Sequence, residues 1–328
     1  MMNLLEIKNL KTYFEKNRVI SKAVDGVSFV LHKGEILGLI GESGCGKSVT
    51  ALSILRLIAE PGKIAEGEII FEDGDLLTLN TEKMRAIRGN QIAMIFQEPM
   101  TSLNPVFTCG NQVAEALLEH KKITAGEAQS QVIGLFREVG LPDPEQIFSA
   151  YPHELSGGMR QRVMIAMALA CGPSILIADE PTTALDVTVQ AQILELIKRL
   201  QKERAMSVIL ITHDFGVVAE MCDRVVVMYA SKVVEFADVK TIFKNPRHPY
   251  TTGLLNSIPK IDSVQQTLNT IPGIVPDASH YPSGCHFHLR CFLANDRCKN
   301  EKPDLIEIEP GHTVACWEWE KVVHTRER

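Results

Sequence analysis

The run Gly-Glu-Ser-Gly-Cys-Gly-Lys-Ser at residues 41–48 constrains the fold more than any other feature of this sequence. It follows a short apolar run, Glu35 to Ile40, and precedes Ser48 to Ile58, where apolar residues recur at helical spacing. Glycines in such a loop let backbone N–H groups turn inward around phosphate oxygens, and the helix start adds a positive dipole. The order of strand, glycine loop and helix therefore predicts a phosphate-binding loop. The alternative is a glycine turn that binds nothing.

Each position of this loop has an expected role in holding a phosphorylated ligand. Lys47 reaches the β and γ phosphates, and the hydroxyl of Ser48 is a ligand for Mg²⁺. Cys45 contributes its backbone N–H rather than its thiol. The residues expected to contact the ligand are Gly41, Ser43, Gly44, Cys45, Gly46, Lys47, Ser48 and Val49.

Short apolar runs rich in isoleucine and valine recur along the chain and predict strands that are buried on both faces. These runs are Ile92 to Phe96, Ile175 to Ala178, Val208 to Thr212 and Arg224 to Tyr229. Helical segments lie between them, and Val189 to Lys202 has the clearest helical spacing. This alternation predicts an α/β fold with a parallel sheet. Near the start of the chain, the alternating segments Leu4 to Leu10 and Ala23 to Leu31 predict antiparallel strands with one exposed face.

Strand signals fade between residues 98 and 170, which predicts a helical insertion. Its helices are expected at Asn111 to His120, Ala125 to Val139 and Met159 to Ala170. The uncharged stretch Val163 to Ala178 is too short for a membrane span and predicts a buried helix, a turn and a buried strand. Prolines become frequent after Phe236, so we expect one domain at residues 1–236 and a smaller one at 237–328.

The overall composition excludes several classes of protein. Hydrophobic residues make up 45% and charged residues 23%, which is the mixture of an ordinary folded domain. There are 34 Lys and Arg residues against 40 Asp and Glu residues, and the formal charge of −6 argues against a nucleic-acid partner. Met1 to Lys16 contains no apolar core of a secretory signal, so we expect a cytoplasmic protein whose cysteines stay reduced.

Asp179 and Glu180 end the predicted strand Ile175 to Ala178 and supply a second set of ligand-binding groups. Asp179 is expected to hold Mg²⁺ directly or through water, because this ion prefers hard oxygen ligands. Glu180 is expected to activate the water that attacks the γ-phosphate. Adjacent carboxylates at a strand end are often only a solvated turn, so this interpretation depends on the loop at Lys47.

Leu155 to Arg162 resembles the signature sequence of ATP-binding cassette (ABC) ATPases, and other motifs follow in the order found in that family. Gln97 resembles the Q-loop glutamine, Ala184 to Asp186 the D-loop, and His213 the switch histidine. The resemblance covers about residues 4 to 236 and implies hydrolysis of ATP with Mg²⁺. Gln97 would contact Mg²⁺ and signal to the helical insertion, and His213 would bind the γ-phosphate and the attacking water.

The same resemblance implies a P-loop sheet core, an antiparallel β subdomain, a helical insertion and a head-to-tail dimer. Ser156, Gly157 and Gly158 begin a helix, so they offer free N–H groups and a positive dipole to an anion. In the family, they close over the γ-phosphate held by the partner, beside Asp186 of the D-loop. Phe14 would stack on adenine. Tyr13 is the alternative, and either ring could instead belong to the core.

Motifs beyond residue 236 resemble the C-terminal region of the ATPase subunits of oligopeptide and dipeptide importers. They include Arg247 to Thr251, Gly284 to Phe287 and Arg290-Cys291. Met100 to Pro105 resembles the D-type subunit of these importers, with Glu98 where aspartate is more usual and Ser231 where glycine is commoner. The resemblance implies a subunit that energises import of dipeptides or oligopeptides. Import of nickel or another small solute by the same machine is the alternative.

The expected partners follow from this resemblance. They are two integral membrane permease subunits, a paralogous ATPase subunit or a second copy of this chain, and an extracytoplasmic peptide-binding protein within the complex. The chain would then lie at the cytoplasmic face of the membrane as a peripheral subunit. A soluble ABC ATPase acting on nucleic acid or ribosomes fits less well, because there is one cassette and only 57 residues separate Gln97 from Leu155. An iron–sulfur electron carrier would leave the phosphate loop unexplained.

Four of the eight cysteines, Cys285, Cys291, Cys298 and Cys316, fall within the last 44 residues. Four thiolates can hold either a zinc ion or an iron–sulfur cluster. Zinc sites favour closer pairs than the intervals here, and the importer resemblance implies a 4Fe-4S cluster in a small metal- or cluster-binding domain. Zn²⁺ and four unliganded thiols are the alternatives, and His286 and His288 are competing ligands.

Overall fold

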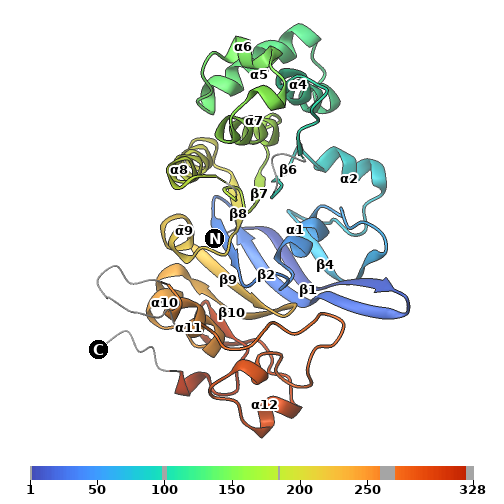
Figure 1. Cartoon of the computed structure of the whole chain (residues 1–328). Helices are drawn as coiled ribbons and strands as arrows, with labels where there is room; N and C mark the ends of the chain where they lie inside the picture. Colours follow the sequence, from blue (N-terminus) through green and yellow to red (C-terminus); the bar gives the residue numbers. More distant parts are fainter. Residues whose placement is uncertain (1, 98–101, 184, 259–269, 323–328) are drawn as a thin grey trace. The chain divides into compact units, whose positions relative to one another are not determined.

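The computed structural model describes residues 2–97, 102–183, 185–258 and 270–322. They form two compact units, each assembled from separate parts of the chain (Figure 1). One unit contains residues 32–35 and 78–211, and the other contains residues 2–31, 36–77 and 212–328. Three predicted features, Glu98, Met100-Thr101 and Ala184, lie outside the described residues.

Three parallel strands form the sheet of the first unit, in the order β8–β7–β6. They are β6 (Ile92–Ile95), β7 (Ile175–Asp179) and β8 (Ser207–Ile211). In register, Ile175 of β7 lies opposite Ile92 of β6 on one side and opposite Ser207 of β8 on the other. Every residue of β7 and β8 is buried, which confirms the strands predicted from the apolar runs.

Helices make up most of the remainder of this unit. They are α2 (Thr81–Ile87), α4 (Cys109–His120), α5 (Ala125–Glu138), α6 (Pro144–Ser149), α7 (Gly157–Leu169) and α8 (Val187–Arg204), with a 3₁₀ turn at Pro152–Glu154. All three helices of the predicted insertion are confirmed, and α4, α5 and α6 gather beyond α7 in Figure 1. Thr124 and Glu127 form a capping box that starts α5. The carboxylate of Glu138 in α5 binds Arg204 at the end of α8 and so fastens the two helices together.

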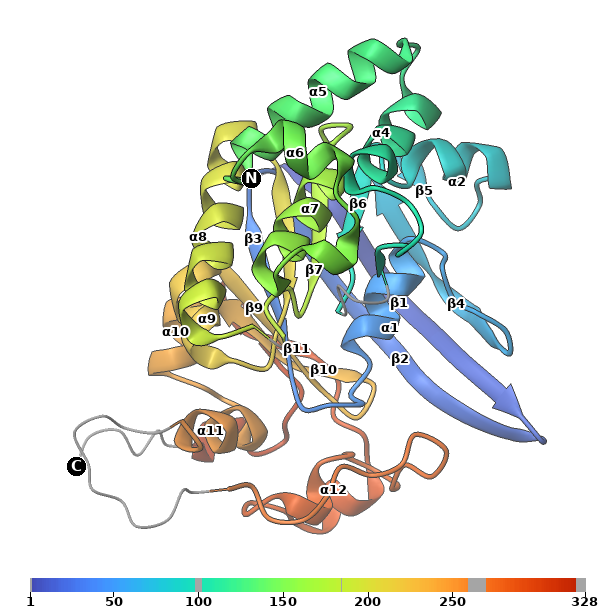
Figure 2. The same ribbon diagram turned by 45° about the horizontal axis from the view of Figure 1, so that its top comes forward.

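An antiparallel sheet in the second unit has the strand order β2–β1–β4–β5. Its strands are β1 (Asn3–Lys16), β2 (Val19–His32), β4 (Gly62–Phe71) and β5 (Gly74–Asp75), and the long β1 and β2 run side by side in Figure 2. The two predicted N-terminal strands are confirmed but are longer than predicted. Beyond Leu10 the chain continues as a strand after an irregularity near Asn9, whose φ is 46°.

The phosphate loop joins β3 (Ile36–Ile40) to α1 (Lys47–Ile54) in this same unit. The strand is buried throughout, as predicted. The helix ends four residues earlier than the predicted Ile58. The reason is local, because Arg56 adopts a left-handed conformation with φ 52°, which a continuing α-helix does not allow.

A second sheet in this unit has the order β3–β9–β10–β12–β11. Its other strands are β9 (Arg224–Tyr229), β10 (Lys232–Asp238), β11 (Ile306–Glu309) and β12 (His312–Val314). The C-terminal segment therefore adds two strands beside β10, and residue 236 lies inside β10. A division into domains at 236–237 stays a prediction.

Short helices fill the remainder of the second unit. They are α9 (Phe215–Met221), α10 (Val239–Lys244), α11 (Pro249–Asn256) and α12 (Asp296–Asn300), with 3₁₀ turns at His288–Arg290 and Trp319–Lys321. The fully buried carboxylate of Glu235 in β10 accepts hydrogen bonds from the N–H groups of Arg247 and His248 and from Nε2 of His312. These bonds tie α11 and β12 to β10. Within the described residues, no helix has the length and apolar character that would let it cross a membrane.

Candidate functional site

Three glycines with positive φ shape the phosphate loop, and they are required for different reasons. A Cβ on Gly41 would lie 2.1 Å from the carbonyl oxygen of Met228, and one on Gly46 would lie 2.3 Å from that of Ala23. Only glycine lets these backbones approach so closely. Gly44, with φ 78°, has open space where its Cβ would be. The loop is thus fixed at two points by neighbouring strands and is open at Gly44, which is exposed.

Lys47 lies at the start of α1, where it follows the loop. Its Nζ donates hydrogen bonds to the carbonyl oxygens of Gly41 at 2.7 Å and Glu42 at 3.0 Å, and the residue is only 6% exposed. The first turn of α1 contains no acidic residue, and no side chain caps it, so its positive dipole is not neutralised locally. Ser48 and Val49 are half-buried in this turn. The arrangement places a cation and helix N–H groups beside the loop, as a phosphate site requires.

The thiol of Cys45 is a core group rather than a ligand-binding group. Cys45 is fully buried, and its Sγ lies 3.7 Å from Nζ of Lys47. Burial raises the pKa of this thiol, so it stays protonated. The side chain of Ser43, by contrast, is exposed at the tip of the loop.

Gln97 and Glu180, which are 83 positions apart in the sequence, come together in the first unit. Nε2 of Gln97 donates to Oε2 of Glu180 at 3.0 Å, and Oγ1 of Thr183 donates to the same oxygen at 2.9 Å. Glu180 has φ 45°, a left-handed conformation that is uncommon for a residue with a side chain and clusters at functional sites. Its N–H donates to the carbonyl of Ile211 at the end of β8. The contact from Thr183 was not anticipated by the sequence analysis, although the residue lies only three positions after Glu180.

Asp179 is the last residue of β7 and is 4% exposed. Its carboxylate is therefore carried by a rigid central strand, immediately before the strained backbone of Glu180. A buried carboxylate at the carboxyl end of a parallel strand suits a hard cation.

The signature residues begin α7 and are held by a cap within α7 and by packing against α8. Ser156 caps the helix by accepting a hydrogen bond from the N–H of Met159 at 3.3 Å, and the first turn contains no acidic residue. Ser156 and Gly157 are exposed. A Cβ on Gly158 would lie 2.8 Å from Cγ1 of Val189 in α8, so the glycine permits close packing of the two helices. Asp186 caps α8 by accepting from the N–H of Val189 at 3.0 Å.

His213 and Phe14 belong to the second unit, together with the phosphate loop. His213 is exposed and lies just before α9, whose N-cap is Asp214. The hydroxyl of Tyr13 donates to Asp25 at 2.7 Å, whereas Phe14 is half-buried beside Gly62. The loop, His213 and Phe14 thus lie in one unit, and Gln97, Asp179, Glu180, Asp186 and the signature residues lie in the other.

All four C-terminal cysteines line one small cavity, together with His248, Phe287, Leu293, Pro303 and Trp317 among others. The N–H of Cys285 donates to the carbonyl of Cys298, and a Cβ on Gly284 would lie 2.3 Å from that carbonyl oxygen. Burial raises the pKa of Cys291 to about 11 and that of Cys316 to about 12, and it also raises that of Cys285. The four cysteines thus lie around one cavity, and their role as ligands stays a prediction.

Both histidines near these cysteines have one ring nitrogen engaged, and His288 also lines the cysteine cavity. Nδ1 of His286 is bonded to the carbonyl of Ala230 with its ring stacked on Tyr281, and Nδ1 of His288 is bonded to the carbonyl of Cys285. In the part of the chain that the structure describes, no group of three or more His, Cys, Asp or Glu side chains is arranged to hold a metal ion. A metal- or cluster-binding C-terminal domain is thus not established by the geometry.

Comparisons with known proteins agree with the fold and the loop. A family model described as ABC transporter matches residues 24–183, and one described as oligopeptide/dipeptide transporter, C-terminal region, matches residues 234–298. Among solved structures, a dimeric ATP-binding cassette in a post-hydrolysis state, bound to ADP and Pi, is 28% identical with a TM-score of 0.65. The match covers 72% of this chain and 98% of that one. The matched family model, the phosphate loop between β3 and α1 and the signature residues at the start of α7 together identify the class of this chain as ABC-type ATPase.

Curated relatives match over nearly the whole length. An oligopeptide transport ATP-binding protein of Bacillus subtilis is 53% identical, and 98% of each chain is covered. A probable peptide ABC transporter ATP-binding protein of Sinorhizobium fredii is 52% identical over 98% of this chain and 96% of the relative. A dipeptide transport ATP-binding protein of Bacillus subtilis is 51% identical over 97% and 95%. The chain belongs to this family of ABC transporter ATP-binding proteins, which accounts for both the cassette and the C-terminal region.

Proposed function

We propose that this chain hydrolyses ATP to drive the import of dipeptides or oligopeptides through a membrane ABC transporter. The observation that carries the proposed mechanism is the carboxylate of Glu180, which Gln97 and Thr183 orient at a strained backbone position. An oriented carboxylate at a strand end can accept a proton from an attacking water. The printed names of the relatives support a peptide substrate, and nickel or another small solute is the alternative.

In this proposal, the loop holds the phosphates, and Nζ of Lys47 keeps its bonds to Gly41 and Glu42 while its third N–H donates to a phosphate oxygen. The predicted loop contacts extend from Gly41 to Val49. Ser48, Asp179 and Gln97 supply oxygen donors of the kind that Mg²⁺ prefers. When bound, Mg²⁺ offsets the negative charge of the phosphates. These roles rest on the type and position of the residues.

Two further residues complete the proposed nucleotide site. His213 follows β8 and is exposed, so its imidazole is accessible to a γ-phosphate. Phe14 rather than Tyr13 stacks on adenine, because the hydroxyl of Tyr13 is already engaged with Asp25.

We also propose that two cassettes act together. The N-terminus of α7, where Ser156 and Gly157 are exposed and Gly158 is half-buried, would close over the γ-phosphate of a partner cassette. Asp186, the N-cap of α8, would lie beside that phosphate. The partner is a paralogous ATPase subunit or a second copy of this chain. Two integral permease subunits and an extracytoplasmic peptide-binding protein complete the complex, and the chain lies at the cytoplasmic face of the membrane.

For the C-terminal region we propose a 4Fe-4S cluster held by Cys285, Cys291, Cys298 and Cys316. The four cysteines line one cavity, and thiolates are the ligands that such a cluster needs, although the side chains are not arranged around a metal in the described residues. Binding of the cluster would stabilise a short segment that has little hydrophobic core of its own. Zinc is the alternative. Anaerobic purification followed by iron and sulfide assays should find about four of each per chain, whereas a colourless protein with one zinc would contradict the cluster.

The catalytic assignment is tested by the substitution Glu180→Gln in the complex with its membrane subunits. ATP binding should persist while hydrolysis falls by about 10³-fold or more, because the amide cannot accept the proton. Glu195→Gln, an exposed position on α8, is the matched control and should hydrolyse ATP at the normal rate. Near-normal turnover by Glu180→Gln would remove Glu180 from the mechanism.

The substrate is tested with the same complex in proteoliposomes. Dipeptides, oligopeptides and Ni²⁺ are added separately with the binding protein, and ATP hydrolysis is measured. Stimulation by peptides alone supports the proposal. Stimulation by Ni²⁺ alone would leave the ATPase intact and overturn the substrate.

A further inference from the structure

The second residue of the phosphate loop, Glu42, is held from two sides by the C-terminal segment. Its N–H donates to the hydroxyl of Tyr250 in α11 at 2.8 Å. Its carboxylate forms a bidentate pair with Arg290, with Nη1 2.7 Å from Oε2 and Nη2 3.0 Å from Oε1. All three residues lie in the same compact unit. The C-terminal segment therefore contacts both the backbone and the side chain of the loop at one position.

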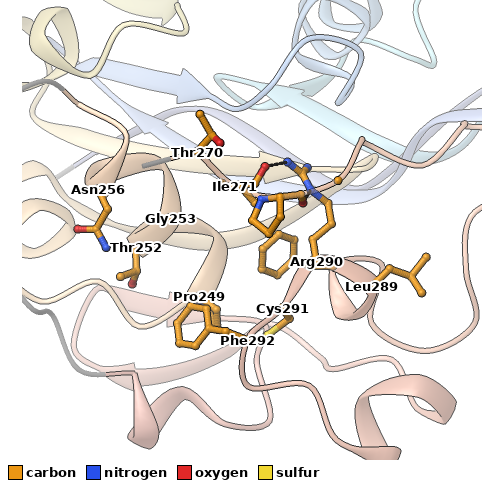
Figure 3. A pocket seen from close by; sticks show the side chains of 13 residues that line it. Pro249, Thr252, Gly253, Asn256, Thr270, Ile271, Leu289, Arg290, Cys291 and Phe292 are labelled. Carbon is orange, nitrogen blue, oxygen red and sulfur yellow. Dashed lines mark hydrogen bonds between the residues drawn. The ribbon is translucent and has the colours of Figure 1, made fainter. Parts of the chain in front are cut away.

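The guanidinium group of Arg290 is held by a complete set of hydrogen bonds. A guanidinium has five N–H donors, and each has an acceptor here: both oxygens of Glu42, the hydroxyl of Tyr229, and the carbonyls of Ile271 and Pro272. The bond to Ile271 is drawn in Figure 3, where Arg290 also forms part of the wall of a cavity of about 620 Å³. The side chain of Arg290 is only 4% exposed, so the pair is shielded from water on the arginine side.

The aromatic side chains around this pair fix the hydroxyl of Tyr250 in the same way. Tyr250 is fully buried, and its ring packs at 4.6 Å from that of Tyr229 and 5.4 Å from that of Phe287. Phe287 and Arg290 belong to the segment between Cys285 and Cys291. The groups that hold Glu42 therefore come from α11 and from the cysteine segment, and their aromatic rings pack against one another and against Tyr229 of β9.

Glu42 in turn contacts the loop lysine. The carbonyl oxygen of Glu42 accepts a hydrogen bond from Nζ of Lys47, and so does the carbonyl of the preceding Gly41. A shift of Glu42 would therefore move two of the atoms that orient this ammonium group. We propose that Arg290 and Tyr250 are positioning residues for ATP binding, which hold the phosphate loop in shape through Glu42. This inference rests on the ATP-binding role of the loop.

The test compares Arg290→Gln, Arg290→Lys, Glu42→Gln and the double variant Arg290→Gln/Glu42→Gln in the reconstituted complex, with Mg-ATP as the ligand. The KM for ATP should rise on the order of tenfold in Arg290→Gln with kcat little changed, because the interaction supports ground-state and transition-state binding alike. Arg290→Lys keeps the charge without the bidentate geometry and should recover part of the loss. The double variant should be no worse than the more affected single variant, since both remove one interaction.

The matched control is Arg297→Gln, which breaks an exposed pair with Glu301 in the same segment and touches no loop residue. Its KM for ATP should match that of the unsubstituted protein.

Additive effects of Arg290→Gln and Glu42→Gln on KM, or an unchanged KM in both variants, would overturn the proposal. If Arg290→Gln does not fold, Tyr250→Phe decides: it removes the partner of the Glu42 N–H and should raise KM, and an unchanged KM would overturn the proposal. Failure of the unsubstituted protein to bind Mg-ATP would instead refute the proposed function.

Discussion

The phosphate loop and the signature loop both present a glycine-rich helix N-terminus, but they are held in place by different means. In the phosphate loop, Gly41 and Gly46 lie against backbone carbonyls of β9 and β2. In the signature loop, Ser156 caps its own helix and Gly158 lies against a valine side chain. The first loop is thus fixed by the backbone of neighbouring strands, and the second by its own helix cap and by a side chain of the neighbouring helix α8.

This difference predicts how each loop tolerates change. A backbone oxygen cannot be removed by substitution, so a clash with it has no simple remedy. A clash with a side chain can be relieved by shortening that side chain. We therefore expect the phosphate loop to be the less tolerant of the two, although both are proposed to bind phosphate.

The largest effect is expected for Gly41→Ala. Its Cβ would lie 2.1 Å from the oxygen of Met228, which would force the loop away from β9. We expect a loss of more than about 3 kcal/mol in the free energy of unfolding and no measurable ATP binding. Thermal unfolding and nucleotide titration measure both quantities. Normal affinity in this variant would contradict the view that the loop is fixed by β9.

A smaller and reversible effect is expected for Gly158→Ala. Its Cβ would lie 2.8 Å from Cγ1 of Val189, and we expect a loss of about 1–3 kcal/mol in the free energy of unfolding. The double variant Gly158→Ala/Val189→Ala should recover most of that loss, because the obstructing methyl groups are gone. Denaturant unfolding of the single and double variants tests this. An equal loss of unfolding free energy in the single and double variants would show that contacts other than Val189 exclude a side chain at position 158.

The smallest effect on stability is expected for Gly157→Ala. The nearest atom to its Cβ would be 3.4 Å away on Leu185, and alanine stabilises a helix by up to about 1 kcal/mol relative to glycine. Thermal unfolding should therefore show no loss. If hydrolysis by the complex nevertheless falls, the exposed face of Gly157 contacts a ligand rather than supporting the fold. Unchanged hydrolysis would argue against the proposed closure over a partner's phosphate.

Much of the sheet core could be predicted from the sequence, because strands that are buried on both faces consist of nearly continuous apolar residues. Arg224–Tyr229 was predicted with the same bounds, and β6, β7 and β8 within one residue at each end. The phosphate loop could also be placed, because its glycines, Lys47 and Ser48 are local in sequence. The end of α1 could not, since it depends on the left-handed conformation of Arg56.

Contacts between distant segments could not be predicted in the same way. Glu42 and Arg290 are 248 positions apart, and neither residue carries a local signal for the other. Strands β4, β5, β10, β11 and β12 were also missed. Strands β5, β11 and β12 are short, and β4 and β10 mix buried with half-buried or exposed positions, so their sequences carry no clear strand pattern. Arg290 beside Cys291 was noted as part of a motif, but its partner in the loop emerges only from the fold.

Strands β12 and β11 form the outer edge of the sheet that contains β3, β9 and β10. Strand β12 pairs with β10, placing Val314 opposite Glu235, and β11 follows as a four-residue outer strand that carries Glu307 and Glu309. Exposed strand edges invite pairing with other chains, and short, acidic edges discourage it. A chain cut after residue 236 would lose this hairpin and leave the outer side of β10 bare. We therefore expect the C-terminal hairpin to make the cassette less prone to aggregate through the edge of β10.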